Sequence, residues 1–288
     1  MSLRETLESG RFAVTAEVGP PKGVDVERML EVAERLRGRV TAINVTDNQS
    51  AVMRMSTLAA CGLLQERGHE TVFQVTCRDR NRLALQSDLL GVWALGVRNV
   101  LALTGDHPRA GDHAGACPVY DLESVQLLSA ISSLNEGRDM AGGELSQAPE
   151  LFAGAVVTPE AEPLEPQMRK FEKKVRAGAR FFQTQAVYDV DRFEAFMERA
   201  RGHGVPVLAG ILLLRSARMA VFLNEKVPGV RVPEAFVRRL EESDKPAETG
   251  IRIAGEIIRA LQPCCDGVHV MAVGAEHRVV DVLDAAGL

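Results

Sequence analysis

The chain has 288 residues, of which 46% are hydrophobic and 25% charged, as in ordinary globular proteins with one large core or two smaller ones. The formal net charge is -5 and no basic run occurs, so composition argues against nucleic acid and membrane surfaces as partners. The longest apolar run, 205–214, contains Pro206 and Gly210 and is too short to span a membrane.

The first residues, MSLRETLESGRF, contain no apolar segment of the kind that a signal peptide needs. The cysteines are odd in number and lack C-x-x-C spacing: Cys61, Cys77, Cys117, Cys264 and Cys265. Thiols without a disulfide framework fit a reducing compartment. The sequence therefore predicts a cytoplasmic protein without a metal site.

Hydrophobic periodicity predicts about eight strands, each followed by a helix. The first strand starts at Phe12 and stops at Gly19-Pro20-Pro21, because proline cannot donate to a sheet ladder. Further strands are expected at 40–46, 71–76, 97–103, 152–157, 181–185, 205–212 and 267–273. Helices are expected at 29–36, before Gly68, at 81–95, 122–134, 164–175 and 189–201, in two or three segments of 216–261, and at 276–286.

Regular alternation of strand and helix over this length predicts a parallel sheet closed into a single (β/α)8 TIM barrel, an α/β fold that spans residues 1–288. An irregular loop at 107–121 and a polar insertion at 135–150 interrupt the pattern. A doubly wound open sheet is the alternative. It would need a G-x-G-x-x-G turn after the first strand, which TAEVGPPKG lacks.

Polar side chains stand near the carboxyl ends of the predicted strands, where the active site of such a barrel forms. Glu17 shares a face with Ala13 and Thr15, and glutamate is rarely buried unless it is paired or functional. A solvated edge glutamate is the alternative. The other strand ends carry Thr46-Asp47-Asn48-Gln49, Gln74, Thr76, Thr104-Gly105-Asp106, Thr158, Glu160 and Gln183-Thr184-Gln185.

Carboxylates among amides, with no Ser-His-Asp order and no His-Cys cluster, favour acid/base or cofactor chemistry over acyl transfer or metal hydrolysis. His269 falls in the middle of an apolar strand and is interpreted as a core histidine. Lys173 and Lys174 are most simply a solvated helix flank, with a phosphate contact as the alternative.

The motifs TAEVGPP, NVTDNQ, TGDHP, GAVVTPE, KVRAGARFFQTQ, AGILLL and DGVHVMAVG together resemble the methylenetetrahydrofolate reductase family over about residues 10–288. The resemblance implies a flavin-bearing barrel, with FAD or FMN, that NADH or NADPH reduces. The flavin then passes hydride to 5,10-methylenetetrahydrofolate and gives 5-methyltetrahydrofolate. The setting would be one-carbon metabolism and methionine biosynthesis.

The resemblance also implies residue roles. Glu17 would be the general acid, with its pKa raised by burial beside a planar cofactor and by the charge of Asp106. Asp106 would lie by the flavin and the pterin and be the second catalytic residue. The cofactors would be bound by Thr46, Asp47, Gln74, Thr104, Gly105, Asp106, Tyr120, Lys173 and Lys174, and the folate by Glu17, Gln185, Met219 and Leu223.

Some positions depart from the family pattern. Thr104-Gly105-Asp106 stands where the family often has RGD, and Gln74 replaces a histidine. Met219 and Leu223 replace a glutamine and a phenylalanine. The segment AVGAEH lacks an arginine that the family often has after the last strand. NVTDNQ and GVHVMAVG are more similar to a shorter branch, some of whose members resemble subunits that work with a metal-cluster protein.

Two alternatives therefore stay open. One is a flavin-free pterin-binding methyltransferase component, and the other is a barrel subunit that is active only with a partner protein. The expected partners are the folate substrate and either further copies of the chain or a second redox subunit.

Overall fold

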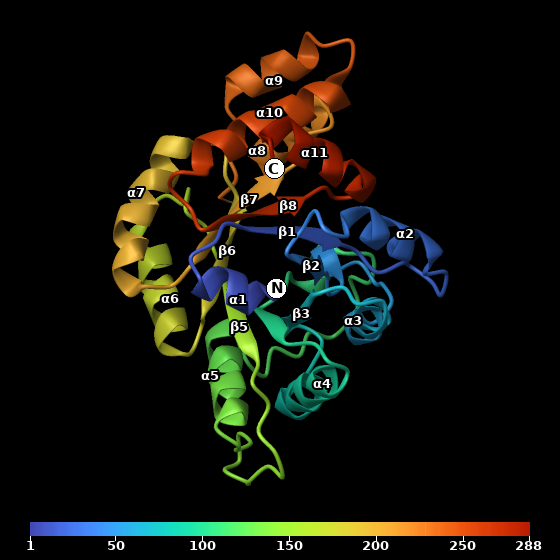
Figure 1. The fold of residues 1–288 in the computed structure, drawn as a ribbon, viewed down its shortest axis with the longest axis vertical. Coiled ribbons are helices and arrows are strands. Elements are labelled where there is room, and N and C mark those ends of the chain that lie inside the picture. The colour runs from blue at the N-terminus through green and yellow to red at the C-terminus, as the bar shows by residue number, and fades with distance from the viewer. Residues whose placement is uncertain (228) are drawn as a thin grey trace.

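The computed structural model describes residues 1–227 and 229–288, and its centre is a closed barrel of eight parallel strands (Figure 1). Each strand pairs with the next along the chain, and the last pairs with the first. The strands are β1 (Ala13–Val18), β2 (Ala42–Val45), β3 (Thr71–Thr76), β4 (Asn99–Leu103), β5 (Phe152–Val157), β6 (Phe181–Ala186), β7 (Val207–Leu212) and β8 (Gly267–Met271). The expected single (β/α)8 barrel is confirmed.

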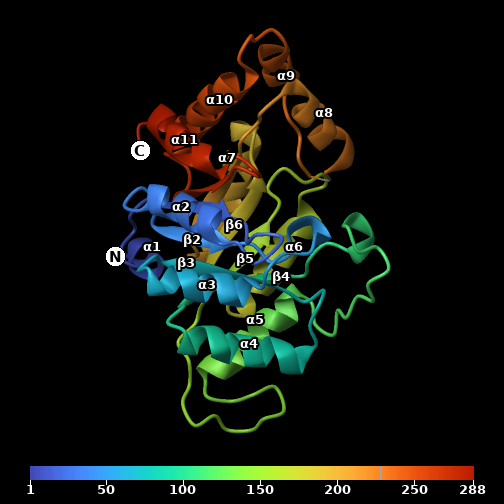
Figure 2. The ribbon, with the colours of Figure 1, turned by 90° about the vertical axis from the view of Figure 1, so that its right-hand side faces the viewer.

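Helices surround the barrel and bury the apolar stripes that the sequence predicts (Figures 1 and 2). In α2, for example, Met29, Val32, Ala33 and Leu36 are buried, as their helical spacing requires. The outer helices are α2 (Glu27–Leu36), α3 (Thr57–Glu66), α4 (Arg82–Ala94), α5 (Ser124–Asn135), α6 (Glu165–Arg176), α7 (Val190–Ala200), α8 (Ala217–Lys226), α9 (Glu234–Glu241), α10 (Pro246–Leu261) and α11 (Val279–Ala286). No helix in the described residues is long and apolar enough to cross a membrane.

A short helix that the sequence pattern did not predict, α1 (Leu3–Glu8), closes the amino end of the barrel. Ser2 and Glu5 form a capping box at its start, which satisfies amides that would otherwise lack a partner. Leu3 and Leu7 are buried against the floor of the barrel interior. The strand residues of that floor are Ala13, Ala42, Val72, Leu101, Phe152, Phe181 and Leu208.

Above this apolar floor, the barrel interior becomes polar toward the carboxyl ends of the strands. Thr15, Asn44, Gln183 and His269 are all buried and bonded to one another across the barrel. Asn44 and Gln183 exchange two amide hydrogen bonds, of 2.8 and 3.1 Å. Because buried polar groups are costly when unpaired, this layer fixes its own side-chain orientations.

The two irregular segments lie at opposite ends of the barrel. The loop at 107–121 contacts two other connections, because Asp112 pairs with Lys22 of the β1–α2 connection and accepts a hydrogen bond from the amide of Met53 in the β2–α3 connection. The insertion at 135–150 joins α5 to β5 on the amino side of the barrel and extends away from the strands (Figure 1). Only the first segment borders the strand ends where chemistry is expected.

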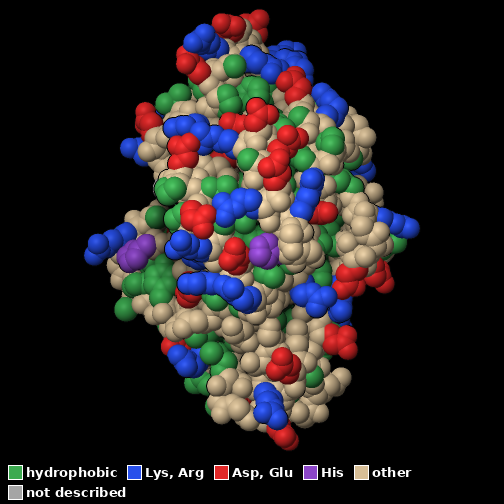
Figure 3. All heavy atoms as spheres, turned by 90° about the vertical axis from the view of Figure 1, so that its left-hand side faces the viewer, with side chains coloured by type: hydrophobic (Ala, Val, Ile, Leu, Met, Phe, Trp, Pro, Cys, Tyr) green, Lys and Arg blue, Asp and Glu red, His purple; other side chains and the backbone are tan. Residues whose placement is uncertain are grey.

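The face over α6 and α7 carries acidic and basic side chains interspersed, with no broad area of a single charge in that view (Figure 3). Such a mixture follows from a net charge of -5 distributed over 39 acidic and 34 basic residues. The face that Figure 3 shows thus offers no electrostatic footprint of the kind that polyanions need.

Candidate active site

Glu17 reaches the barrel axis at the carboxyl end of β1 and is 9% exposed, so it is not the solvated edge glutamate of the alternative interpretation. Its Oε2 accepts a hydrogen bond from Gln49 Nε2 at 3.1 Å, and its Oε1 accepts one from Gln74 Nε2 at 3.2 Å. His269 Nε2 lies 3.5 Å from the same Oε1. Three different strands or loops therefore hold one carboxylate at the mouth of the barrel.

The expectation that the pKa of Glu17 is raised overall is wrong for this arrangement. Burial by itself raises the pKa, but the hydrogen bond and charge of His269, together with the amides of Gln74 and Gln49, outweigh it. The pKa of Glu17 therefore lies below its ordinary value. The same contacts that place the carboxylate also favour its ionised form.

His269 is the neighbour of Glu17 that the sequence pattern did not identify. It is 3% exposed, as a core histidine would be, but its ring bridges the polar layer and the carboxylate of Glu17. Its Nδ1 lies 2.9 Å from Thr15 Oγ1 and 3.4 Å from Gln183 Nε2. The parallel pairing of β1 with β8, Thr15 opposite His269, is what brings the histidine beside Glu17. That register was not readable from the apolar neighbours of His269.

The β2–α3 connection that carries Gln49 is strained. Asn48, Ser50 and Ala51 have φ values of 45°, 55° and 57°, a left-handed backbone that asparagine adopts readily but that is unfavourable for serine and alanine. Asn48 Oδ1 accepts a hydrogen bond from the amide of Arg54, which holds the loop in this shape. Strain of this kind is commonly kept where a side chain must be aimed, and here it aims Gln49 at Glu17.

Asp47 lies directly below this loop, and both of its carboxylate oxygens are already bonded to the protein. Oδ2 accepts from Arg80 at 2.7 Å and from the amide and hydroxyl of Thr76 at 2.8 and 2.9 Å. Oδ1 accepts from Thr57 and from Arg80. The neighbouring Thr46 is 3% exposed and borders the mouth. Asp47 thus joins β2, β3 and α3, while its contact with a cofactor stays a prediction.

Gly105 gives the end of β4 a shape that another residue would not adopt. Its φ is +87°, and a Cβ there would lie 2.9 Å from Thr76 Cβ. Tyr120 donates from its hydroxyl to the carbonyl of Gly105 at 3.1 Å, and Thr104 Oγ1 accepts from the amide of Ser124 at the start of α5. Asp106, next in the chain, is exposed at the mouth. The predicted group 104–106 therefore presents a backbone edge and a free-standing carboxylate to a ligand.

The structure separates the predicted lysine pair. Lys173 is exposed and lines a cavity of about 600 Å³ between the starts of α5 and α6, together with Lys170 and Arg169. Lys174 is 6% exposed, and its Nζ donates to the carbonyl of Val156 in β5 at 2.6 Å. Burial, together with the nearby Lys170, lowers the pKa of Lys174 to about 8. Lys173 is open to solvent in a cavity that Glu123 and Glu165 also line, and its phosphate contact stays a prediction, whereas Lys174 is anchored to the barrel wall.

The predicted folate contacts also differ in their placement. Gln185 is exposed at the carboxyl end of β6, beside the mouth. Met219 is half-buried in α8, and Leu223 of the same helix is 6% exposed and packed into the core around the barrel. Gln185 is therefore open to a ligand, and the folate contacts of Met219 and Leu223 stay predictions.

Comparison with known proteins identifies the family. A sequence model described as "Methylenetetrahydrofolate reductase" matches residues 2–287. The chain belongs to the methylenetetrahydrofolate reductase family. The 5,10-methylenetetrahydrofolate reductase of Pectobacterium carotovorum subsp. carotovorum is 28% identical over 265 residues, which cover 88% of this chain and 82% of that protein.

Another family member, methylenetetrahydrofolate reductase (NADH) 1 of Arabidopsis thaliana, is 26% identical over 300 residues, covering 99% of this chain and 50% of that protein. Among solved structures, a tryptophan synthase of Mycobacterium tuberculosis superposes with a TM-score of 0.53 at 15% identity, covering 99% of this chain and 95% of that one. A dihydropteroate synthase of Yersinia pestis has a TM-score of 0.51 at 8% identity, with coverages of 96% and 93%. These structures support the barrel fold alone.

Replacing Asp47 with alanine is expected to cost stability rather than ligand contacts. The change leaves the partly buried Arg80 with Asp88 alone and the buried amide and hydroxyl of Thr76 without their acceptor, so the free energy of unfolding should fall by about 3 kcal/mol or more in urea titrations. Asp88→Ala is the matched control, because Asp88 also pairs with Arg80 but is partly exposed, and it should cost about 1 kcal/mol or less. Unchanged stability in Asp47→Ala would mean that the carboxylate serves a ligand.

Lys174→Met should change how stability depends on pH. The folded pKa of about 8 lies below the ordinary 10.5, so protonating Lys174 costs stability, fully below pH 8 and less as pH rises to 10.5. The variant lacks this cost. Its stability relative to the natural protein should therefore decline between pH 8 and 10.5, measured by chemical denaturation. The exposed Lys173→Met should show no such trend, and parallel curves for Lys174→Met would contradict the prediction.

Proposed function

We propose that this protein reduces 5,10-methylenetetrahydrofolate to 5-methyltetrahydrofolate, with NADH or NADPH as the electron donor and FAD or FMN as the bound carrier. The observation that supports this most strongly is the carboxylate of Glu17, held at the centre of the barrel mouth by Gln49, Gln74 and His269. The family to which the chain belongs also supports the proposal, because its members are named for the reduction of this folate.

The residues at the mouth fit a flavin. The left-handed Gly105 lets a planar ring approach the backbone closely, and Thr46, Gln74 and Tyr120 offer polar groups around that edge. Lys173 and the neighbouring basic side chains line a cavity that Glu123 also lines. The next residue, Ser124, donates its amide to Thr104 Oγ1. That cavity suits the phosphates of the cofactor. When bound, the flavin would take up a hydride from the nicotinamide and supply it to the folate.

Reduction of the folate needs a general acid near its reacting carbon. The substrate carries a methylene group between two nitrogens, and hydride reaches that carbon easily only after one carbon–nitrogen bond has opened. Opening needs a proton on the departing nitrogen. Glu17 is the carboxylate that the barrel holds at its axis, so it delivers the proton, and Gln185 at the rim donates to or accepts from the pterin edge.

Since the contacts of Glu17 favour its ionised form, the proton must be stored nearby. His269 is 3.5 Å away, and Thr15 and Gln183 hold the other side of its ring. Glu17 and His269 thus lie close enough for a proton to pass between them. A substrate that displaces Gln49 from Glu17 removes one of the contacts that stabilise the carboxylate, which moves the proton toward the leaving nitrogen.

Glu17→Gln separates the two half-reactions. The purified protein should show flavin absorption at about 450 nm, and stopped-flow reduction by NADH or NADPH should be nearly unchanged in the variant because that step needs no proton from Glu17. Reoxidation by the folate should fall by about 10²-fold or more. Glu160→Gln, a second buried glutamate that caps the backbone of Tyr188 and Asp189, should slow neither step.

The outcomes of that experiment are distinct. Protein that neither contains nor takes up FAD or FMN would favour the flavin-free pterin-binding alternative. A flavoprotein that is inactive until a second protein is added would favour the partner-dependent subunit. Equal slowing of both half-reactions in Glu17→Gln would make Glu17 a support of the cofactor pocket instead of the acid.

His269→Gln should shift the pH profile of the folate half-reaction. The rate falls as pH rises through the pKa of the acid, and removing the histidine removes the strongest contact that lowers the pKa of Glu17. The falling limb should therefore move to higher pH. His69→Gln is the control, since His69 is also buried beside a glutamate, Glu34, away from the mouth. An unshifted limb would remove His269 from the proton path.

A further inference from the structure

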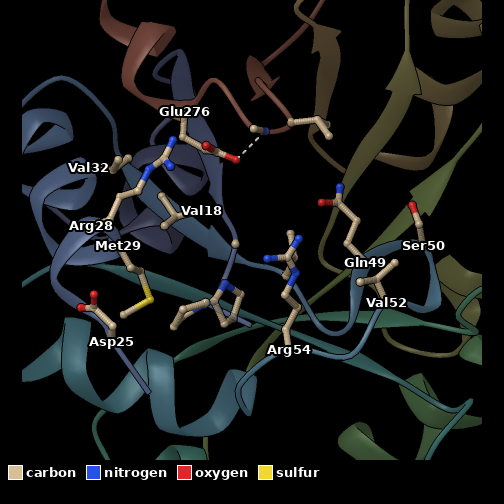
Figure 4. Close-up of a pocket in the computed structure, with 16 residues that line it drawn as sticks. Val18, Asp25, Arg28, Met29, Val32, Gln49, Ser50, Val52, Arg54 and Glu276 are labelled. Atoms are coloured by element: carbon tan, nitrogen blue, oxygen red, sulfur yellow. Dashed lines mark hydrogen bonds between the residues drawn. The ribbon is translucent and has the colours of Figure 1, made fainter. Parts of the chain in front are cut away.

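The carboxylate of Glu17 has an outer and an inner side. On the outer side, Gln49 donates to its Oε2 and also lines a cavity of about 610 Å³ beside the barrel mouth (Figure 4). On the inner side, His269 faces its Oε1 and leads into the polar layer of the barrel. The hydrogen bonds of that layer determine which nitrogen of His269 carries a proton.

The amide of Gln183 has both of its hydrogens in use. Asn44 Nδ2 donates to Gln183 Oε1 at 2.8 Å, which fixes the orientation of this amide. The Nε2 of Gln183 donates to Asn44 Oδ1 at 3.1 Å and to Thr15 Oγ1 at 3.2 Å. An amide nitrogen has two hydrogens, and a hydroxyl group has one. Thr15 Oγ1 therefore accepts from Gln183, and its own hydrogen is available for another acceptor.

Thr15 has two acceptors within reach, and the nearer one is His269 Nδ1. The distance from Thr15 Oγ1 to Nδ1 is 2.9 Å, and the distance to the carbonyl oxygen of Val268 is 3.5 Å. An imidazole nitrogen that accepts has no hydrogen, so the neutral ring carries its proton on Nε2. Nε2 faces Glu17 Oε1 at 3.5 Å. The neutral ring thus matches an ionised Glu17.

A proton on Nδ1 reverses the role of Thr15. Nδ1 then needs an acceptor, and Gln183 Nε2, 3.4 Å away, only donates. Thr15 Oγ1 has a second lone pair and accepts, while its own hydrogen turns to the carbonyl of Val268. Because Thr15 is 0% exposed, bulk water does not compete for Nδ1.

The strands on either side of β8 present no other charged group to the ring. Gly210 of β7, opposite His269 in the register, has no side chain, and β1 presents Thr15 and Glu17. Among residues 1–227 and 229–288, Glu17 is the acid within ion-pair distance of His269. The protonation of the ring is therefore governed by Glu17 at Nε2 and by Thr15 at Nδ1.

We propose that Thr15 is a positioning residue whose hydroxyl determines which nitrogen of His269 carries the proton beside Glu17. While Glu17 is ionised and the ring is neutral, Thr15 donates to Nδ1. When a charged ring passes its Nε2 proton to Glu17 Oε1, the ring becomes neutral with its remaining proton on Nδ1, and Thr15 accepts. The hydrogen-bond assignment stands without the proposed function, whereas the use of this proton for the folate rests on it.

Long-range proton–nitrogen NMR spectra of isotope-labelled protein report the protons on each ring nitrogen and need neither flavin nor folate. The natural protein should show a neutral His269 ring with its proton on Nε2, and His269→Gln assigns its signals among the six histidines. In Thr15→Val, which keeps the shape but cannot accept, Nδ1 should gain its proton at a pH lower by about one unit or more. Thr15→Ser keeps the hydroxyl and should restore the natural behaviour.

Thr71→Val is the matched control. Thr71 is 1% exposed on β3, and its hydroxyl donates to Gln65 and takes no part in the polar layer. Its loss should leave the signals of His269 unchanged.

The outcomes separate this proposal from the proposed function. A neutral ring with its proton on Nδ1 in the natural protein would overturn the assignment, and this result needs no variant that folds. The assignment also fails if Nδ1 gains its proton at the same pH in Thr15→Val as in Thr71→Val. If the spectra change as expected while Thr15→Val reduces the folate at the natural rate, the assignment stands and the role of His269 in the proposed function fails.

Discussion

Glu17 carries a carboxylate that folding takes almost completely out of water, and an ionised group in such a place needs partners or it neutralises. Gln49, Gln74 and His269 provide them, and His269 in turn depends on Thr15 and Gln183. The middle of the barrel is therefore polar, where a packed TIM-barrel interior is usually filled by branched apolar side chains. Strand register, the strained β2–α3 connection and the histidine of β8 all serve this one requirement.

A polar middle layer contributes less hydrophobic stabilisation, so cohesion must come from elsewhere in the fold. The apolar floor, closed by α1, and the shell between strands and outer helices provide it. The rings of Phe152 and Phe181 stack at 5.2 Å in that floor. Burial of each such side chain contributes about 1.5–3 kcal/mol. The barrel thus separates an apolar amino end from a polar carboxyl end, and the cohesion of the apolar regions offsets the strain of Ser50 and Ala51.

The alternation of strands and helices was readable from the sequence because hydrophobic period and glycine or proline stops mark each element, as at Gly19-Pro20-Pro21. Glu17 was identifiable as a strand-end carboxylate. The direction of its pKa and the part played by His269 were not, because both depend on which residue of β8 lies opposite Thr15, a register that local patterns do not encode. The differing environments of Lys173 and Lys174 have a local cause, since Lys174 follows the buried Phe171 by three positions and so falls near the apolar stripe of α6.

The contact between the 107–121 loop and the β2–α3 connection carries a consequence for how such chains can diverge. A Cβ at Gly111 would lie 1.8 Å from the carbonyl oxygen of Ala51, so no larger residue fits there while Ala51 keeps its backbone shape. The two loops belong to different βα units, yet neither can accept a substitution or an insertion at this point independently. Across evolution they should behave as one inherited block, with position 111 released from glycine only in lineages where the turn at 49–51 has been rebuilt.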